Sequence, residues 1–159
     1  MKITVVAVGK LKEKFYVQAV EEYAKRLSRY CRLEILQVAD EKTPDGASEA
    51  AERQIREKEG KRILSQIKDG AYVIALAIQG EMVTSEGLAE RLERLAVDGN
   101  GHIVFVIGGS LGLSDEVLNR ADWKLSFSRM TFPHQLMRVI LLEQVYRSYR
   151  IQSGEPYHK

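Results

Sequence analysis

The sequence predicts an α/β fold with a mostly parallel sheet flanked by helices. Segments with strand periodicity alternate with segments of helical periodicity from one end of the chain to the other. Residues 72–78 are apolar almost without interruption, as expected of an inner strand that is covered on both faces. At 159 residues the chain is long enough to bury its own core, and we expect one domain over residues 1–159.

The first part of the chain is expected to form a strand over 3–8 and a helix over about 15–30, in which apolar residues recur at helical spacing. Residues 33–38 alternate between apolar and polar side chains, like a strand with one buried face. A turn-rich segment over 40–48 leads to a highly charged helix over about 49–68. The first half of that helix carries little apolar surface, so we expect it to face solvent.

The inner strand and the helix after it have recognisable boundaries. The strand over 72–78 is expected to stop at Gln79, where a glycine follows. Thr84 or Ser85 can cap the next helix by accepting a hydrogen bond from its first turn. Leucines at helical spacing form the inward stripe of this helix: Leu88, Leu92 and Leu95.

Two further strands are predicted over 103–107, directly after a glycine-rich breaker, and over 123–127. Between them a short helix is expected, with Ser114 as its N-cap. Asp115 and Glu116 lie in its first turn, where negative charges interact favourably with the helix dipole.

The last helix is predicted over about 134–150 and has more apolar surface than one face of a helix on a small monomer needs. Such a surplus favours packing on a second copy of the chain. The apolar residues are Leu136, Met137, Val139, Ile140, Leu141, Leu142, Val145, Tyr146 and Tyr149.

Composition excludes several classes of protein. No apolar run approaches the roughly 20 residues that a membrane helix needs, so no membrane partner is expected. The N-terminus leads straight into a strand without the plan of a signal peptide, which favours a cytoplasmic location. Cys31 is the only cysteine, and no Cys/His cluster has zinc spacing, so neither a disulfide nor a metal site is predicted.

Charge alone does not identify a partner, because a net charge of +2 is too small to argue for nucleic acid. Basic residues do cluster locally and could follow phosphates. Solvated faces balanced by the 22 acidic residues are an equally good interpretation. The clusters are Lys10, Lys12 and Lys14; Lys25, Arg26, Arg29 and Arg32; and Arg138, Arg147 and Arg150.

The strand over 103–107 runs directly into Gly108-Gly109-Ser110-Leu111-Gly112. Ligands of open α/β sheets bind at such strand ends, where glycines allow close approach to backbone N–H groups. The segment is not a dinucleotide fingerprint, because Ser110 and Leu113 stand where glycines are required, and it is not a P-loop, because no Gly-Lys-Ser/Thr follows. The turn suits a flat group such as adenine or ribose; alternatively, its glycines serve only to adopt positive φ.

A second strand end, at residue 127, leads into the polar loop Ser128-Arg129-Met130-Thr131-Phe132-Pro133. This loop lacks the Gly/Asn/Asp enrichment of a plain turn, and its backbone could surround an adenine. The alternative is a hydrophobic staple into the last helix, with Pro133 at its start. Together the two strand ends predict one pocket for a small polar cofactor. Leu76 would add a wall, although by itself it is more typical of the core.

The chain ends in a short polar tail over 154–159. In it, Tyr157 can stack on a base and His158 can exchange protons near neutral pH. Arg147 and Arg150, one turn earlier, could hold a phosphate or stabilise an oxyanion. A frayed tail with an incidental histidine agrees equally well with the sequence.

Taken together, these motifs resemble the SPOUT class of methyltransferases, and the whole chain resembles the ribosomal large-subunit RNA methyltransferase H family. The resemblance covers essentially all 159 residues with no extra domain, so a single SPOUT domain is expected. Its most specific segments are 6–12, 105–113, 125–139, 142–147 and 156–159.

The resemblance implies a homodimeric α/β fold with a C-terminal trefoil knot, whose crevice binds S-adenosylmethionine. It also implies methylation of N3 of a pseudouridine in the 23S rRNA of assembled ribosomes, so RNA rather than DNA is the expected partner. Arg147, Tyr157 and His158 match positions that the family associates with substrate binding or catalysis, reaching across the dimer. The matching cofactor-site positions are Leu76, Gly108, Phe127, Ser128, Arg129, Met130, Thr131 and Phe132.

Specific roles follow as hypotheses. His158 would accept the N3 proton, Arg147 would steady negative charge on the ring oxygens, and Tyr157 would orient the extruded base. His134 is a weaker candidate for the base. A non-enzymatic ribosome-associated factor and a metabolite-modifying nucleotide enzyme are the other interpretations. The second is disfavoured because the chain lacks a Walker lysine, a ribose-binding acid after the first strand and paired acidic metal ligands.

Overall fold

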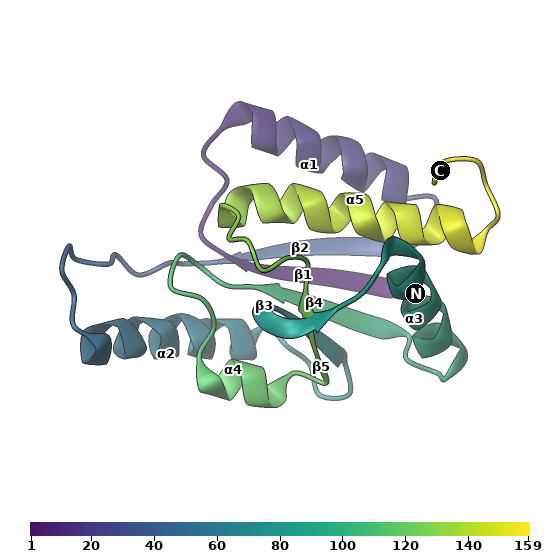
Figure 1. Ribbon diagram of the computed structural model, residues 1–159. Coiled ribbons are helices and arrows are strands. Elements are labelled where there is room, and N and C mark those ends of the chain that lie inside the picture. The colour runs from purple at the N-terminus through teal and green to yellow at the C-terminus, as the bar shows by residue number, and fades with distance from the viewer.

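The computed structural model describes all residues, 1–159, and shows a five-stranded, all-parallel sheet between two layers of helices (Figure 1). The strand order is β2-β1-β4-β3-β5. The predicted fold class is confirmed. The elements are β1 (Lys2–Val8), α1 (Lys14–Leu27), β2 (Arg32–Val38), α2 (Glu49–Ser65), β3 (Tyr72–Met82), α3 (Ser85–Val97), β4 (His102–Ile107), α4 (Asp115–Arg120), β5 (Trp123–Ser126) and α5 (His134–Gln152).

The two helical layers are set by the alternation of side chains along the buried strands. Ile3, Val5 and Ala7 of β1 belong to a core shared with α1, α3 and α5. Val6 and Val8 point the other way, into a core shared with α2 and α4. Because its apolar side chains alternate between the two directions, β1 is buried on both faces.

All five strands point the same way, so their carboxyl ends lie at one edge of the sheet. Helix α5 begins at this edge and runs back along the sheet, so that the C-terminus ends beside the N-terminus at the opposite edge (Figure 1). It lies between α1 and α3. None of its residues is fully exposed, so neighbours within the same chain cover much of the apolar surplus that the sequence shows.

The expected end of β3 at Gln79 is wrong. The strand continues to Met82 and pairs with β5 again after a register shift between Leu76 and Glu81. Gly80 allows this, because a Cβ at that position would lie 2.7 Å from the backbone carbonyl of Lys124.

Helix α2 is more buried than predicted. Ile55, Glu59 and Gly60 are all buried, and a Cβ on Gly60 would lie 2.3 Å from Oγ of Ser114. The first half of the helix faces solvent as expected, except for Ile55, whereas Glu59 and Gly60 in the second half are covered, Gly60 by Ser114 and Val117 at the start of α4.

Other differences affect only the ends of elements: α1 ends at Leu27, α2 at Ser65 and β5 at Ser126, whereas α5 continues to Gln152. The caps at Thr84 and Ser114 are confirmed, and so is the buried leucine stripe of α3. The trefoil knot stays a prediction. None of the helices has the length and apolar character required to cross a bilayer.

Candidate active site

A cavity of about 740 Å³ lies at the carboxyl ends of β3, β4 and β5. Its walls come from the glycine turn after β4, the loop after β5 and the first turn of α5. The two strand ends that the sequence singles out therefore form one pocket, as predicted. Its size is that of a site for a small organic ligand.

The glycine turn after β4 is closed by its own backbone. The N–H of Gly112 donates a hydrogen bond to the carbonyl of Gly109 at 3.1 Å, and Gly112 has a φ of +83°. A Cβ on Gly108 would lie 2.9 Å from the backbone carbonyl of Gly112. Gly112 thus serves to adopt positive φ, whereas Gly108 is needed for the close approach of two backbone segments.

The loop after β5 is organised by its serines. Oγ of Ser126 donates to the carbonyl of Ser128 at 3.1 Å, and Oγ of Ser128 accepts from the N–H of Met130 at 2.9 Å. Pro133 then occupies the N-cap position of α5. These local bonds hold the 127–132 loop beside the glycine turn without a regular strand or helix.

Most of the cofactor-site residues predicted from the resemblance line this pocket. Arg129 does not: its side chain is exposed and lies outside the lining. The predicted residues that do line it are Leu76, Gly108, Phe127, Ser128, Met130, Thr131 and Phe132.

The lining also contains residues that the sequence argument missed, among them Arg56, Gln79 and Met137. Arg56 lies on the highly charged α2, where nothing in the pattern distinguishes it from its neighbours. Met137 sits in the apolar stretch of α5 and could have been found from its position in the first turns after the loop.

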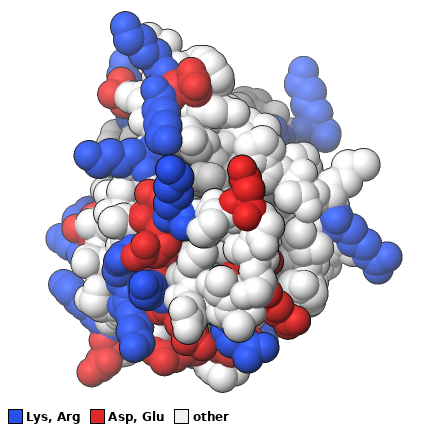
Figure 2. Space-filling view, turned by 90° about the vertical axis from the view of Figure 1, so that its left-hand side faces the viewer, with Lys and Arg blue, Asp and Glu red and all other residues white.

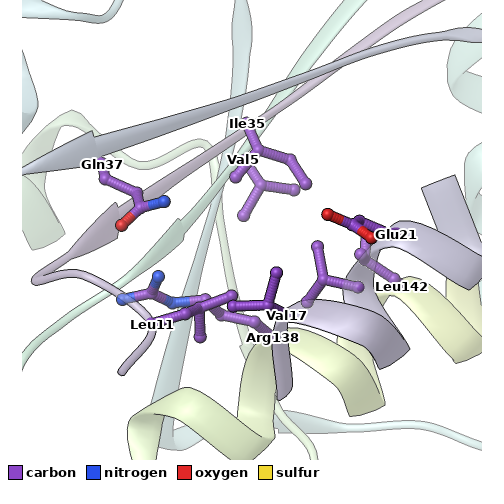
Figure 3. A pocket seen from close by; sticks show the side chains of 9 residues that line it. Val5, Leu11, Val17, Glu21, Ile35, Gln37, Arg138 and Leu142 are labelled. Carbon is purple, nitrogen blue, oxygen red and sulfur yellow. The ribbon is translucent and has the colours of Figure 1, made fainter. Parts of the chain in front are cut away.

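Arg138 is buried, at 2% exposure, in the space between α5 and the sheet (Figure 3). It lines a cavity of about 220 Å³ together with Glu21 and Gln37. Its Nη2 donates hydrogen bonds of 2.8 Å to the carbonyls of Val8 and Gly9, where β1 ends. Burial lowers the pKa of this guanidinium. Arg138 is therefore an anchor for the end of β1, and it is not available to bind phosphate as its sequence cluster suggested.

Glu59 is a buried carboxyl group behind the glycine turn, at 4% exposure. Oε2 accepts a hydrogen bond from the N–H of Glu41 at 2.9 Å, while Oε1 has no partner and faces Gly109. Burial raises the pKa of this carboxyl, and the negative charge of Asp40 adds to the effect. Glu59 thus connects the 40–48 segment to the floor of the turn.

The C-terminal tail is held by specific contacts. Glu155 accepts a hydrogen bond from Tyr30 and pairs with Arg150, each at 2.6 Å. The ring of Tyr157 packs edge-on against Tyr146, with the centroids 5.0 Å apart. The tail is therefore held in place and is not frayed. The guanidinium of Arg150 is already paired with Glu155 and is not free to bind a phosphate.

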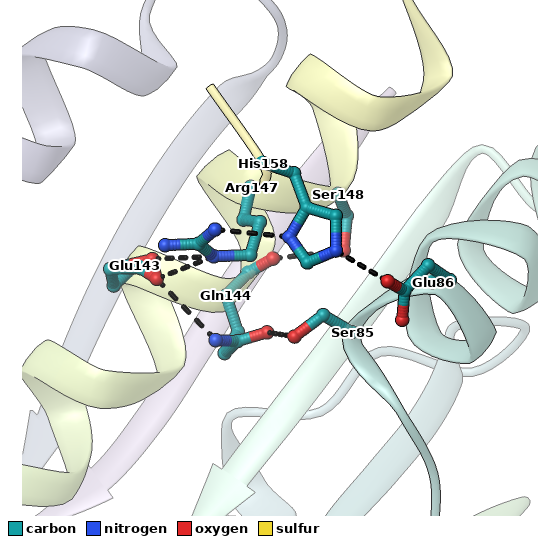
Figure 4. A network of polar contacts seen from close by, with 7 residues as sticks. All are labelled: Ser85, Glu86, Glu143, Gln144, Arg147, Ser148 and His158. Carbon is teal, nitrogen blue, oxygen red and sulfur yellow. Dashed lines mark hydrogen bonds and ion pairs between the residues drawn. The ribbon is translucent and has the colours of Figure 1, made fainter. Parts of the chain in front are cut away.

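Arg147 and His158 meet at the end of α5 (Figure 4). Nη1 of Arg147 lies 3.1 Å from Nδ1 of His158, while its Nε donates to Glu143 at 2.9 Å. The guanidinium also lies 4.7 Å from the centre of the Tyr157 ring. On its other side His158 contacts the carboxylate of Glu86 through Nε2. The structure thus brings together all three residues predicted for catalysis.

Within one chain, however, these three residues are remote from the pocket. Arg147 follows the pocket residue Met137 by ten positions on α5, which corresponds to about 15 Å along the helix. His134 is the histidine that does line the pocket. Its pKa is lowered by burial and by the nearby charge of Arg138, which favours the neutral imidazole. A single chain therefore carries the pocket and the tail cluster at opposite ends of the same helix.

Comparison with known proteins agrees with the geometry. The family described as "Predicted SPOUT methyltransferase" matches residues 1–158. The chain is 64% identical to ribosomal RNA large subunit methyltransferase H 1 of Clostridium perfringens (strain SM101 / Type A) over 159 residues, which is all of both chains. The corresponding enzyme of Bifidobacterium adolescentis is 62% identical over 159 residues, and that of Clostridium kluyveri is 60% identical, again over the full length of both chains.

Among solved structures, a probable methylase family protein from Haemophilus influenzae Rd KW20 aligns with 96% of this chain and 66% of its own, at 14% identity and a TM-score of 0.49. The match over 158 residues and the full-length identities of 60–64% decide the family. The chain belongs to the SPOUT methyltransferases and, within them, to the ribosomal RNA large subunit methyltransferase H family.

Proposed function

We propose that this protein is an S-adenosylmethionine-dependent enzyme that methylates N3 of a pseudouridine in the 23S rRNA of assembled ribosomes. Family membership supports the reaction class, and the names of the relatives support ribosomal RNA as the substrate. The observation that carries the proposal is the pocket of about 740 Å³ between the glycine turn and the 127–132 loop. The proposal includes a cytoplasmic location, where the protein has access to ribosomes.

The pocket fits a nucleoside-containing methyl donor. Its walls combine apolar side chains, such as Leu76 and Phe127, with the backbone of the glycine turn. A side chain at Gly108 would collide with the backbone of Gly112, so the two backbone segments of the turn lie in close contact. An adenine could lie against this surface and satisfy its polar edge with backbone groups of the loop. Arg56 at the wall would suit a carboxylate of the ligand.

When bound, S-adenosylmethionine would supply a methyl group attached to a positively charged sulfur. On transfer of the methyl group, this sulfur would become the neutral thioether of the leaving group. The protein then has to bring N3 of the base into line and to take away its proton. The imidazole of His158 is the proposed acceptor of that proton, and the guanidinium of Arg147 would steady charge on the ring oxygens. Tyr157, beside Arg147, would stack on or orient the extruded base.

We infer that the active site is completed by a second copy of the chain. The tail cluster and the pocket are about 15 Å apart along α5, too far for both to contact one methyl group and its acceptor. A dimer that sets α5 of one subunit against the pocket of the other would bring His158 to the cofactor. This separation, rather than the apolar surplus of α5, is the main support for the dimer.

The test is mass spectrometry of 23S rRNA from cells with and without this protein, combined with transfer of label from methyl-tritiated cofactor to purified ribosomes. We expect one methylated pseudouridine to disappear on deletion and to return when the purified protein is added. A non-enzymatic ribosome-associated factor would bind ribosomes without transferring label, and this result would eliminate the proposal.

A further inference from the structure

Glu86 lies in the first turn of α3, and its carboxylate contacts Nε2 of His158. In Figure 4 this carboxylate lies on one side of the imidazole ring, and the guanidinium of Arg147 lies on the other. The proton transfer described above gives a task to His158 and to Arg147 but none to Glu86. Glu86 is therefore a direct partner of the proposed proton acceptor to which no function is yet assigned.

The carboxylate of Glu86 is free to make this contact because another residue caps α3. Oγ1 of Thr84 accepts a hydrogen bond of 3.0 Å from the N–H of Gly87. The backbone N–H of Glu86 itself and the hydrogen bond with His158 both lower the pKa of the Glu86 carboxyl. Glu86 is therefore ionised near neutral pH, and a carboxylate can only accept a hydrogen bond.

Arg147 is held independently of His158. Its Nε donates to Glu143 at 2.9 Å, while its Nη1 lies 3.1 Å from Nδ1 of His158. Because a guanidinium has only donors, neutral His158 has its lone pair on Nδ1 and its hydrogen on Nε2, toward Glu86. A uracil-type base presents N3–H beside a carbonyl oxygen, so it can donate to Nδ1 while the oxygen accepts from Arg147. Once the base has replaced Nη1 at Nδ1, Glu86 is the residue that keeps the hydrogen on Nε2.

The surroundings that His158 would meet in the proposed dimer are positively charged. Figure 2 views the end of the molecule where α5 begins and the cofactor pocket lies, and many Lys and Arg side chains stand out on it. Arg56 lines the pocket, and the sulfur of the methyl donor is positive as well. Positive charges oppose the formation of an imidazolium, so a negative partner has to accompany His158. Glu143 is already paired with Arg147, whereas Glu86 faces the imidazole itself.

We propose that Glu86 is a positioning residue for the proton acceptor. It keeps the hydrogen of neutral His158 on Nε2, so that Nδ1 can take the N3 proton, and it compensates the charge of the imidazolium that forms. The inference rests on the proposed function and deepens it, since it assigns the partner on which His158 depends.

The two steps of the reaction balance as follows from this arrangement. The N3–H bond breaks, an Nδ1–H bond forms on His158, and the electron pair stays on N3. The same pair then bonds to the methyl carbon, and the electrons of the carbon–sulfur bond stay on sulfur. Because both steps use one lone pair of N3, the proton has to leave first. His158 then carries hydrogens on both nitrogens, and the carboxylate of Glu86 stabilises it more strongly once RNA and the partner exclude water.

The alternative is an ion pair that only holds the tail in place. The side chain of Glu86 is 60% exposed, and ion pairs of that kind contribute little to stability. The tail is already held by Glu155, which pairs with Arg150 and accepts a hydrogen bond from Tyr30. Retention of the tail therefore does not require Glu86.

The first experiment needs neither cofactor nor RNA. Nitrogen NMR of the imidazole follows the protonation of His158 in the whole protein as the pH is varied. In Glu86→Gln the pH of half-protonation should be lower than in the wild type by roughly 0.2–0.7 pH units, the effect of one exposed carboxylate. Glu90→Gln, which removes a charge paired with Arg94 one turn further along α3, is the control. The other titratable or charged groups beside the ring are the same in all variants: Arg147, Glu143, Tyr157 and Lys159.

The second experiment measures methyl transfer to ribosomes. We expect Glu86→Gln to lower kcat roughly 5- to 100-fold, less than loss of the base itself, with KM for the ribosome and the affinity for S-adenosylmethionine nearly unchanged. In a protein that already carries His158→Ala, Glu86→Gln should have no further effect, because Glu86 acts through His158. A variant of a merely structural contact would not show this dependence on His158.

Three results would overturn the inference: an unchanged kcat in Glu86→Gln, a further loss of turnover in the His158→Ala protein, or half-protonation of His158 at the same pH in Glu86→Gln and the wild type. Absence of methyl transfer by the wild type, with the NMR result as expected, would instead remove the proposed function and leave the pairing of Glu86 with His158 in place.

Discussion

Nη1 of Arg147 lies 3.1 Å from Nδ1 of His158, and this contact determines which nitrogen of the imidazole is free to carry a proton. A guanidinium has only donors, so Nδ1 must accept. In the neutral imidazole the hydrogen therefore sits on Nε2, which faces the carboxylate of Glu86. Both nitrogens of His158 are therefore engaged within the single chain. A substrate that uses His158 as its base must replace one of these two partners.

His158→Ala should lower turnover by about 10²–10⁴-fold, the usual contribution of a general base. The affinity for S-adenosylmethionine should stay nearly constant, because the proposed role of His158 is to accept the proton of the base, and His158 is not among the residues that line the pocket. Label transfer to ribosomes and calorimetry measure the two effects separately. Lys159→Ala, at the exposed last residue, is the matched control. A loss of cofactor affinity with unchanged chemistry per bound cofactor would show that the assignment is wrong.

Mixed dimers test whether the tail acts across the subunit interface. One variant lacks residues 157–159 and keeps Glu155, whose contacts with Tyr30 and Arg150 hold the rest of the tail. The other carries Gly108→Val, which blocks the pocket. Each homodimer should be inactive, whereas random mixing should restore about one quarter of wild-type activity, since half of the dimers then contain one intact site.

The mixed-dimer experiment has a clear negative outcome. If the tail served the pocket of its own subunit, no pairing of these variants would contain a complete site and mixing would restore nothing. Equal mixing is checked by tagging the two variants differently and isolating the doubly tagged dimer.

Gly108→Ala tests the glycine turn. The added Cβ would lie 2.9 Å from the backbone carbonyl of Gly112, so the turn must open. We expect the affinity for S-adenosylmethionine to fall roughly 5- to 150-fold, the equivalent of a misfit of about 1–3 kcal/mol. Gly101→Ala is the control, because a Cβ there meets nothing within 4 Å and its φ is not positive. Equal affinities of the two variants in calorimetry would exclude a role for the turn.

The fold could be predicted because its signals are local. The run of apolar residues in β4 and the cap at Ser114 each specify an element without knowledge of its neighbours. The end of β3 could not be predicted, because it depends on Gly80 lying against Lys124, a contact between segments more than 40 residues apart. The burial of Gly60 has the same origin, since a Cβ there would lie 2.3 Å from Oγ of Ser114 at the start of α4.

For the pocket, too, local signals could be predicted from the sequence, and contacts between distant segments could not. Glycines and hydroxyls at two strand ends predicted its walls, because parallel strands bring their carboxyl ends together. Arg56 was missed because it reaches the pocket from a helix with no distinguishing pattern. The contact of His158 with Glu86 was also missed, because it joins the tail to the first turn of α3, 72 residues earlier in the sequence.

Glu59→Gln should change how stability depends on pH. The folded state raises the pKa of Glu59, mainly by burial, although the N–H of Glu41 and the charge of Arg62 act in the opposite direction. Between the ordinary pKa of a glutamate and the raised value, the folded protein binds more protons than the unfolded chain. The free energy of unfolding should therefore fall as the pH rises through this window and stay at its lower value above it.

Gln has no charge to bury and can still accept the hydrogen bond from Glu41, so the variant should lose this part of the pH dependence. Above the window we expect it to be more stable than the wild type by on the order of 1 kcal/mol, because an unpaired buried charge costs more than an unpaired amide. Urea unfolding at a fixed protein concentration, from about pH 4 to pH 8, measures the difference. Glu57→Gln, exposed on the same helix, is the control and should follow the wild-type curve. Parallel curves for Glu59→Gln and the wild type would mean that Glu59 is ionised at no cost in the folded protein.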